Sequence, residues 1–200
     1  MIQAVLLALV AGYADTVGFL RFEAFAGLMT GNTILLGIEV ATAKWSGAGY
    51  HLAIMGVFLL GVALAQVLAR LGQKPWVALS ATAGLMVLCG VTDKLTASLL
   101  LPLAMGLQNS AANRFNGVAL NTVFITGNIQ KVGEGLIAWI WPDKDGTRKT
   151  SDGFAIYGLV WIAYAVGAGL GALAERSMTY PLLLPAAVLP FVMLRIARPG

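Results

Sequence analysis

Residues 29–32, Met-Thr-Gly-Asn, are matched 96 residues later by Ile-Thr-Gly-Asn at residues 125–128. Each Thr-Gly-Asn triplet lies within a long apolar run. Glycine inside a helix costs about 1 kcal/mol relative to alanine, and threonine and asparagine compete for the backbone hydrogen bonds. The triplets therefore predict the start of a helix rather than its middle. Thr30 or Asn32 would be the N-cap of a helix over residues 33–43, and the second copy predicts the same at Thr126 or Asn128.

The sequence around the triplets is also repeated. At an offset of 94 residues, Gly12 falls on Gly106 and Asp15 falls on Asn109. At an offset of 106 residues, Gly61 falls on Gly167. The polar stretch 142–149 absorbs the change of register as an inserted loop. An ordered series of matches predicts an internal duplication within a single membrane domain, with one repeat over about 1–94 and the other over about 95–200.

The composition is that of a membrane protein. The chain is 58% hydrophobic and 11% charged, and its mean hydropathy is +0.82, whereas roughly a quarter of the residues in a soluble domain are charged. The basic residues lie mostly at segment ends, which argues against a nucleic-acid partner and for the lipid bilayer. Eight apolar stretches approach the ~20 residues that a membrane-spanning helix needs: 1–20, 24–43, 50–71, 75–91, 95–112, 117–141, 153–174 and 178–196.

The distribution of the thirteen Lys and Arg residues favours one topology. If all eight stretches cross the membrane, they divide eight against five; if the two triplet segments are re-entrant, nine against four. The positive-inside rule favours the second division, with both termini in the cytoplasm. Three crossings per repeat would invert the second repeat relative to the first. The expected fold class is thus an all-α integral membrane protein, a helical bundle of six full spans plus two discontinuous or re-entrant segments built from an inverted repeat.

The triplets are the expected working site. A broken helix at membrane depth is tolerated where it lines a cavity, and its N-terminus presents unpaired N–H groups with partial positive charge. Two such ends meeting near the midplane would bind an anion or a small polar solute. The expected lining is Thr30, Gly31 and Asn32 with Thr126, Gly127 and Asn128. The simpler alternative is that each triplet kinks a helix and bonds to a neighbour.

Polar residues outside the triplets extend the predicted site. Asp15 is a carboxylate within an apolar segment, which marks either a proton or cation-coupling group or a structural contact to Asn109. Gln108 and Asn109 would add polar lining. Lys131 lies one turn beyond the second triplet, where it could attract an anion or pair with Glu134 three residues on.

Four motifs in order carry a family resemblance: Ala-Gly-Tyr-Ala-Asp at 11–15, Met-Thr-Gly-Asn-Thr at 29–33, Met-Gly-Leu-Gln-Asn at 105–109 and Thr-Gly-Asn at 126–128. The chain resembles the YoaK-like family of bacterial inner-membrane proteins, a domain of unknown function. This resemblance covers nearly the whole chain. It implies a multi-pass helical protein of the bacterial cytoplasmic membrane and implies no substrate.

The residues therefore predict a small transporter or channel for an anion or a small polar solute. The alternative is a non-transporting membrane scaffold or assembly partner, in which the polar residues only hold the helices together. We expect no enzyme, cofactor or metal site, because the chain has no nucleophile motif, phosphate-binding loop or zinc spacing. A homodimer is plausible for so thin a bundle, with the small residues of the seam from Gly167 to Gly171 as its candidate contact.

Overall fold

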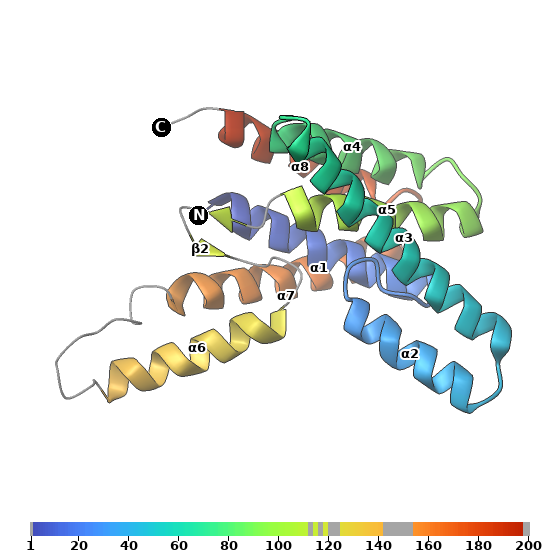
Figure 1. Ribbon diagram of the computed structural model, residues 1–200, viewed down its shortest axis with the longest axis horizontal. Helices are drawn as coiled ribbons and strands as arrows, with labels where there is room; N and C mark the ends of the chain where they lie inside the picture. The colour runs from blue at the N-terminus through green and yellow to red at the C-terminus, as the bar shows by residue number, and fades with distance from the viewer. Residues whose placement is uncertain (1, 112–113, 116–117, 120–124, 142–153, 198–200) are drawn as a thin grey trace.

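The computed structural model describes residues 2–111, 114–115, 118–119, 125–141 and 154–197, so the loop expected over 142–149 lies outside the described residues. The described part consists of eight helices and one short antiparallel strand pair (Figure 1). In the strand pair, which lies between the fifth and sixth helices in the sequence, Arg114 is opposite Ala119. The elements are α1 (Ile2–Phe22), α2 (Met29–Ala41), α3 (Trp45–Arg70), α4 (Pro75–Leu88), α5 (Lys94–Ala111), β1 (Arg114–Phe115), β2 (Val118–Ala119), α6 (Ile125–Ile140), α7 (Phe154–Ser177) and α8 (Leu183–Ala197).

The core lies along α1 and α5, whose buried side chains include Leu7, Leu101 and Met105. Each central helix packs most extensively on a helix of the other half of the chain: α1 on α7, and α5 on α3. The pair α4 and α8 pack on each other, while α2 packs on α3 and α6 on α7. The two halves are therefore interleaved rather than side by side.

Glycines permit close approach of the backbones in both the α1–α7 and the α3–α5 contact. A Cβ atom on Gly12 would collide with the backbone carbonyl oxygen of Tyr164, and one on Gly106 would collide with that of Phe58. Small residues at helix contacts in membranes allow backbones to approach and gain van der Waals contact. The partner helices contribute glycines in the same way, Gly167 against Leu9 and Gly61 against Leu103.

The seam that was the candidate dimer contact is occupied inside the chain. Gly167 faces the backbone of Leu9, and a Cβ on Gly171 would lie 2.7 Å from the carbonyl oxygen of Tyr13. Both glycines are buried against α1. The seam is therefore filled by α1 of the same chain, and it is wrong as the candidate dimer contact; the homodimer itself stays a prediction.

Among the described residues, three helices, α1, α3 and α7, are long and apolar enough to cross a membrane, and α4 and α8 are shorter apolar helices. With a rise of 1.5 Å per residue, the 13 residues of α2 extend about 20 Å, well short of a ~30 Å hydrocarbon core. Large apolar side chains are exposed along the outer helices, among them Leu59, Leu64 and Ile162. Such surfaces suit a lipid environment and would be costly in water.

The chain turns back on itself after α1. The Tyr50 hydroxyl on α3 donates to the carbonyl oxygen of Phe22, 3.1 Å away, which fixes where α1 ends along α3. The Thr33 hydroxyl, near the start of α2, donates to the sulfur of Met55 at 3.4 Å, deeper along α3. The chain after α1 therefore re-enters the bundle, and α2 then runs back out toward the end where α1 finishes. Figure 1 shows α1 and α2 both ending at the right, while α5 and α6 run the opposite way.

Two short connections outside the apolar helices are well capped. Asp93 starts α5: its carboxylate accepts hydrogen bonds from the Thr96 hydroxyl at 2.6 Å and from the backbone N–H groups of Leu95 and Thr96. These bonds hold the pKa of Asp93 below its usual value, and the bond from the Thr96 hydroxyl contributes most. At the end of α2, Ala43 has a left-handed backbone with φ of 56°. The N–H of Lys44 then bonds back to Glu39, as in a Schellman cap.

Candidate functional site

The first triplet lies inside the opening turn of α2 rather than ahead of it. The helix begins at Met29, and Leu28 occupies the N-cap position without a side-chain capping bond. The expectation that Thr30 or Asn32 is the N-cap is therefore wrong. The side chain of Asn32 instead reaches back to Phe25: it accepts from the backbone N–H at 2.9 Å and donates to the carbonyl at 2.8 Å. This pair of bonds fixes the turn that leads into the helix.

Asp15 binds the backbone at the start of α2. It is 2% exposed, and its Oδ1 accepts hydrogen bonds from the backbone N–H groups of Gly27 at 2.6 Å and Leu28 at 3.0 Å. Its Oδ2 accepts a hydrogen bond of 2.6 Å from the hydroxyl of Tyr164 on α7. The structural contact expected for Asp15 is thus present, but to these three groups and not to Asn109.

The Asp15 carboxylate accepts hydrogen bonds from backbone N–H groups that an external anion would otherwise bind. Backbone N–H groups at the start of a helix, together with the helix dipole, favour negative charge. Here the chain supplies a carboxyl group itself. At an offset of 94 residues Asp15 falls on Asn109, which has no carboxyl group, and at an offset of 106 residues Phe58, which has no hydroxyl, falls on Tyr164. The carboxyl group and its hydroxyl donor are therefore both present only once.

The second triplet also lies in the first turn of its helix, because α6 begins at Ile125. The N-cap role expected for Thr126 or Asn128 is not observed. Asn128 is buried at 4% exposure, whereas Thr126 and Gly127 are exposed. Gly31 in the first triplet differs, because the ring of Phe25 lies 2.7 Å from where its Cβ would be. The first triplet is therefore covered by its own turn.

Gln108 and Lys131 have separate roles. Gln108 is fully buried and donates from Nε2 to the carbonyl oxygen of Leu7 at 3.1 Å, so it ties α5 to α1. Lys131 forms an exposed ion pair of 2.7 Å with Glu134, which also accepts from Gln130 at 2.8 Å. Self-pairing, one of the two alternatives for Lys131, is the arrangement observed. Asn109 is partly buried near the end of α5.

The structure brings some of the expected site residues together and leaves others apart. The first triplet and Asp15 form one hydrogen-bonded unit around residues 25–32. The second triplet belongs to α6, which packs on α7, and α2 and α6 are not among the helix pairs in extensive contact within the described chain. In Figure 1 the two helices start near the middle of the molecule and diverge toward opposite ends.

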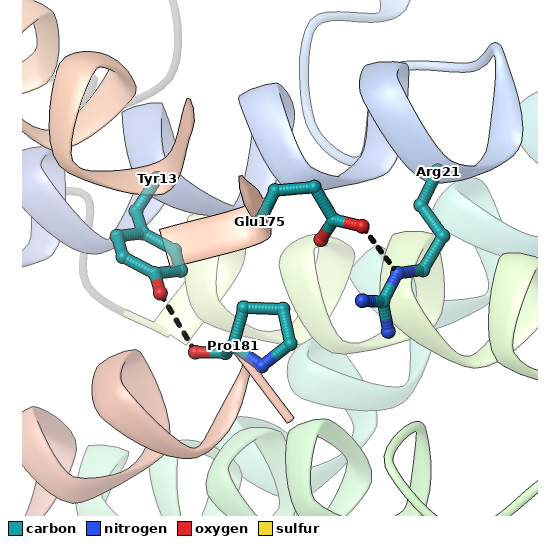
Figure 2. A network of polar contacts seen from close by, with 4 residues as sticks. All are labelled: Tyr13, Arg21, Glu175 and Pro181. Carbon is teal, nitrogen blue, oxygen red and sulfur yellow. Dashed lines mark hydrogen bonds and ion pairs between the residues drawn. The ribbon is translucent and has the colours of Figure 1, made fainter. Parts of the chain in front are cut away.

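Some polar contacts between helices were not anticipated from the sequence. The Tyr13 hydroxyl donates to the carbonyl oxygen of Pro181 at 2.8 Å, and Arg21 pairs with Glu175 at 2.8 Å (Figure 2). Both join α1 to the second half of the chain. Tyr164 was missed as well. A tyrosine within an apolar segment is a signal for a buried hydroxyl contact, but nothing in the sequence names Asp15 as its partner.

A cavity of about 370 Å³ lies among α1, α7 and α8, and it is apolar. Its lining includes Leu9, Tyr13, Leu173 and Val188 and contains neither triplet. It is therefore not the polar cavity that a solute pathway through the triplets needs. Within the described residues, no cluster of three or more His, Cys, Asp or Glu could hold a metal ion.

The comparisons with known proteins agree with the helical membrane architecture. Residues 3–195 match the family described as "Protein of unknown function (DUF1275)". The chain is also 25% identical over 207 residues to the UPF0700 transmembrane protein YoaK of Bacillus subtilis (strain 168), covering 96% of this chain and 92% of that protein. No solved structure matches the chain. With its apolar helices and a family match over almost its entire length, the chain belongs to the DUF1275 family and is a YoaK-like membrane protein.

Proposed function

We propose that this protein is a small transporter or channel for an anion or a small polar solute, with the two triplet helices lining the pathway. The observation that carries the proposal is the buried carboxylate of Asp15 on the N–H groups of Gly27 and Leu28. A half-length helix that starts inside an apolar bundle and attracts negative charge has the form of a transporter binding element. Because Asp15 already fills this position in repeat one, the solute would meet the neutral counterpart in repeat two.

The proposed architecture is an inverted repeat of six full spans with α2 and α6 as re-entrant segments. Its support is the opposite direction of α1 and α5, and of α2 and α6, in Figure 1. The reciprocal contacts are further support, since α1 packs on α7 as α5 packs on α3. The short length of α2 and its return to the end where α1 finishes favour a re-entrant segment over a crossing.

The basic residues suggest how this arrangement sits in the bacterial cytoplasmic membrane. With α2 and α6 re-entrant, four basic residues fall at the end where α1 and α2 finish: Arg21, Lys44, Lys94 and Arg176. On this topology, the other nine of the thirteen basic residues of the sequence would fall at the opposite end. By the positive-inside rule, that opposite end would face the cytoplasm, together with both termini.

A scaffold role is the second candidate, and one observation favours it. The polar side chains of repeat one, Asp15 and Asn32, are buried and bonded to groups of the chain itself. The cavity among α1, α7 and α8 is apolar. In a scaffold these contacts would only lock the helices, and no solute would cross.

Solute flux into proteoliposomes distinguishes the two functions. The panel would contain chloride, nitrate, formate and phosphate with urea and glycerol as neutral solutes. The double variant Thr30→Val/Thr126→Val removes two exposed hydroxyls and leaves the bonds of Asp15 and Asn32 intact. We expect wild type to transport at least one solute, and the double variant to lose about tenfold or more of that flux, equivalent to about 1.4 kcal/mol.

Thr42→Val is the matched control, because it makes the same change at an exposed threonine at the other end of α2. It should keep wild-type flux. Folding is checked for each variant by thermal melting in detergent. A folded wild-type protein that carries no solute of the panel would overturn the transport proposal and favour the scaffold. Equal loss in Thr42→Val and the double variant would show that the triplets are not the pathway.

A further inference from the structure

Three ionisable side chains lie near the place where α2 ends and α3 begins, away from both triplets. Glu23 follows α1, Glu39 lies near the end of α2, and His51 lies on α3. His51 is 5% exposed, although histidine is polar. Glu39 is partly buried and Glu23 exposed. Neither the family description nor the proposed pathway assigns a role to this cluster.

Glu39 and His51 face the same space between the two helices. A Cβ on Gly47 would lie 2.6 Å from Oε2 of Glu39, so this carboxylate rests on the first turns of α3. His51 is four residues after Gly47, on the same face of that helix. Among the described residues, no hydrogen bond or ion pair joins the imidazole to Glu39 or Glu23. The ring of Tyr50 packs beside it, with centroids 5.4 Å apart.

Two buried atoms in this space have no hydrogen-bond partner among the described residues: Nδ1 of His51 and Oε2 of Glu39. A carboxylate oxygen can only accept, and an unprotonated imidazole nitrogen also only accepts. Each such buried atom left without a partner costs about 1–3 kcal/mol. A hydrogen on Nδ1 makes that nitrogen a donor, and a turn of either side chain would then bring it to the carboxylate. The imidazolium carries this hydrogen as well as one on Nε2, so the protonated ring satisfies both atoms and also places a positive charge beside the carboxylate.

We propose that His51 and Glu39 form a proton-binding site that secures the end of α2 against α3 when it is loaded. The inference rests on the proposed function, for which it supplies the coupling ion. When the proton binds, Nδ1–H donates to Oε2 and the imidazolium pairs with the carboxylate; when it leaves, the positive charge goes and the ion pair is lost. The proton comes from water at this end of the bundle and returns to it.

This assignment moves the coupling role away from Asp15. The two oxygens of Asp15 already accept three hydrogen bonds, from Gly27, Leu28 and Tyr164. A proton on Asp15 would compete with these three donors for the carboxylate oxygens. At His51 no such donor competes, because neither Nδ1 nor Oε2 of Glu39 has a hydrogen-bond partner in the described chain. Asp15 therefore serves to hold the start of α2, and the His51 cluster regulates its end.

Other charged groups around the site do not supply the missing donor. Glu23 adds a second negative charge, and Tyr50 already donates its hydroxyl to Phe22. Lys44 in the α2–α3 connection and Lys94 at the start of α5 are exposed, as is Asp93 beside it. None of these forms a hydrogen bond with Nδ1 or Oε2. In the second repeat the positions equivalent to Glu39 and His51 are Gly135 and Tyr157, so the repeat carries no second copy of the pair.

The chain contains one histidine, so histidine labelled with nitrogen-15 reports on this site alone. The experiment follows the imidazole signals of the full-length protein in detergent micelles as pH is varied. Glu39→Gln removes the charge and keeps the shape. We expect the midpoint of His51 protonation to fall by about one pH unit or more, a tenfold change in proton affinity, when Glu39 is neutralised. Glu39→Asp, which retains the charge, should restore much of the shift.

Glu134→Gln is the matched control, since Glu134 is an exposed glutamate on α6 that pairs with Lys131. Its midpoint should equal that of wild type. A midpoint unchanged in folded Glu39→Gln, or shifted equally in Glu134→Gln, overturns the proton site. Flux separates this result from the proposed function. A His51 shift without flux of any solute keeps the proton site and rejects transport; flux with no His51 shift does the reverse.

Discussion

At the scale of single residues, Asp15 and Tyr164 are the contact on which the first triplet depends. Asp15→Ala removes the acceptor for three buried donors. Since each unsatisfied buried donor costs about 1–3 kcal/mol, we expect Asp15→Ala to destabilise the protein by about 3 kcal/mol or more. Asp15→Asn keeps one oxygen for the two backbone groups and should cost clearly less. Thermal melting in detergent gives the order of the two variants.

A double-mutant cycle with Tyr164→Phe completes this test. If the hydroxyl bonds to Asp15 as observed, the losses from Asp15→Asn and Tyr164→Phe should not add. Ser177→Ala is a suitable control, because the exposed Ser177 hydroxyl bonds within its own helix at 2.8 Å, and the variant should melt close to wild type. Additive losses would mean that the Asp15–Tyr164 bond contributes nothing measurable.

The sequence identified several of these residues without identifying their partners. An aspartate within an apolar segment indicates a buried polar contact, and that expectation is met at Asp15. Its partners are two backbone N–H groups and a tyrosine 149 residues away, and no residue pattern encodes backbone donors. The N-cap expectation failed for the same reason. Asn32 looks like a cap, but whether its amide bonds forward or backward depends on the turn before it.

At the scale of elements, glycines decide which helices meet. Gly12→Ala and Gly106→Ala each place a methyl group on the backbone of a partner helix. We expect both variants to lose the folded fraction in detergent, measured as the monodisperse peak in size-exclusion chromatography. Gly84→Ala is the control, since no atom lies within 4 Å of its Cβ position. It should fold as wild type or gain up to about 1 kcal/mol from helix propensity. Folded Gly12→Ala with an unchanged melting temperature would contradict the close approach.

The apolar stretches predicted the helices well and their pairing poorly. Each of the eight stretches overlaps one of the described helices, because long apolar runs leave few alternatives in a membrane. The glycines at 167 and 171 were recognised as a packing seam, but the seam was assigned to a second copy of the chain. It packs on α1 instead. Small-residue spacing shows that a helix approaches another closely, and it does not say which one.

At the scale of the whole molecule, the re-entrant assignment of α2 makes a topological prediction. In a Cys89→Ser background, single cysteines are placed at Ile2, Ser46 and Gln73, of which Ile2 is 58% exposed and the other two are exposed. If α2 is re-entrant, a membrane-impermeant maleimide should label Ile2 and Gln73 from one side and Ser46 from the other. If α2 crosses fully, Ile2 would instead label together with Ser46. Intact and inverted membrane vesicles give the two sides separately.

The interleaving of the halves also sets the order in which the protein can be made. A ribosome that has released only the first repeat has delivered α1 and α3 to the membrane without α7 and α5, the helices on which they pack. The glycine faces of the early helices then remain in contact with lipid until the later helices are inserted. A chain truncated between the two halves would consequently lack the largest helix contacts of the fold. We therefore expect assembly to follow insertion of the second half.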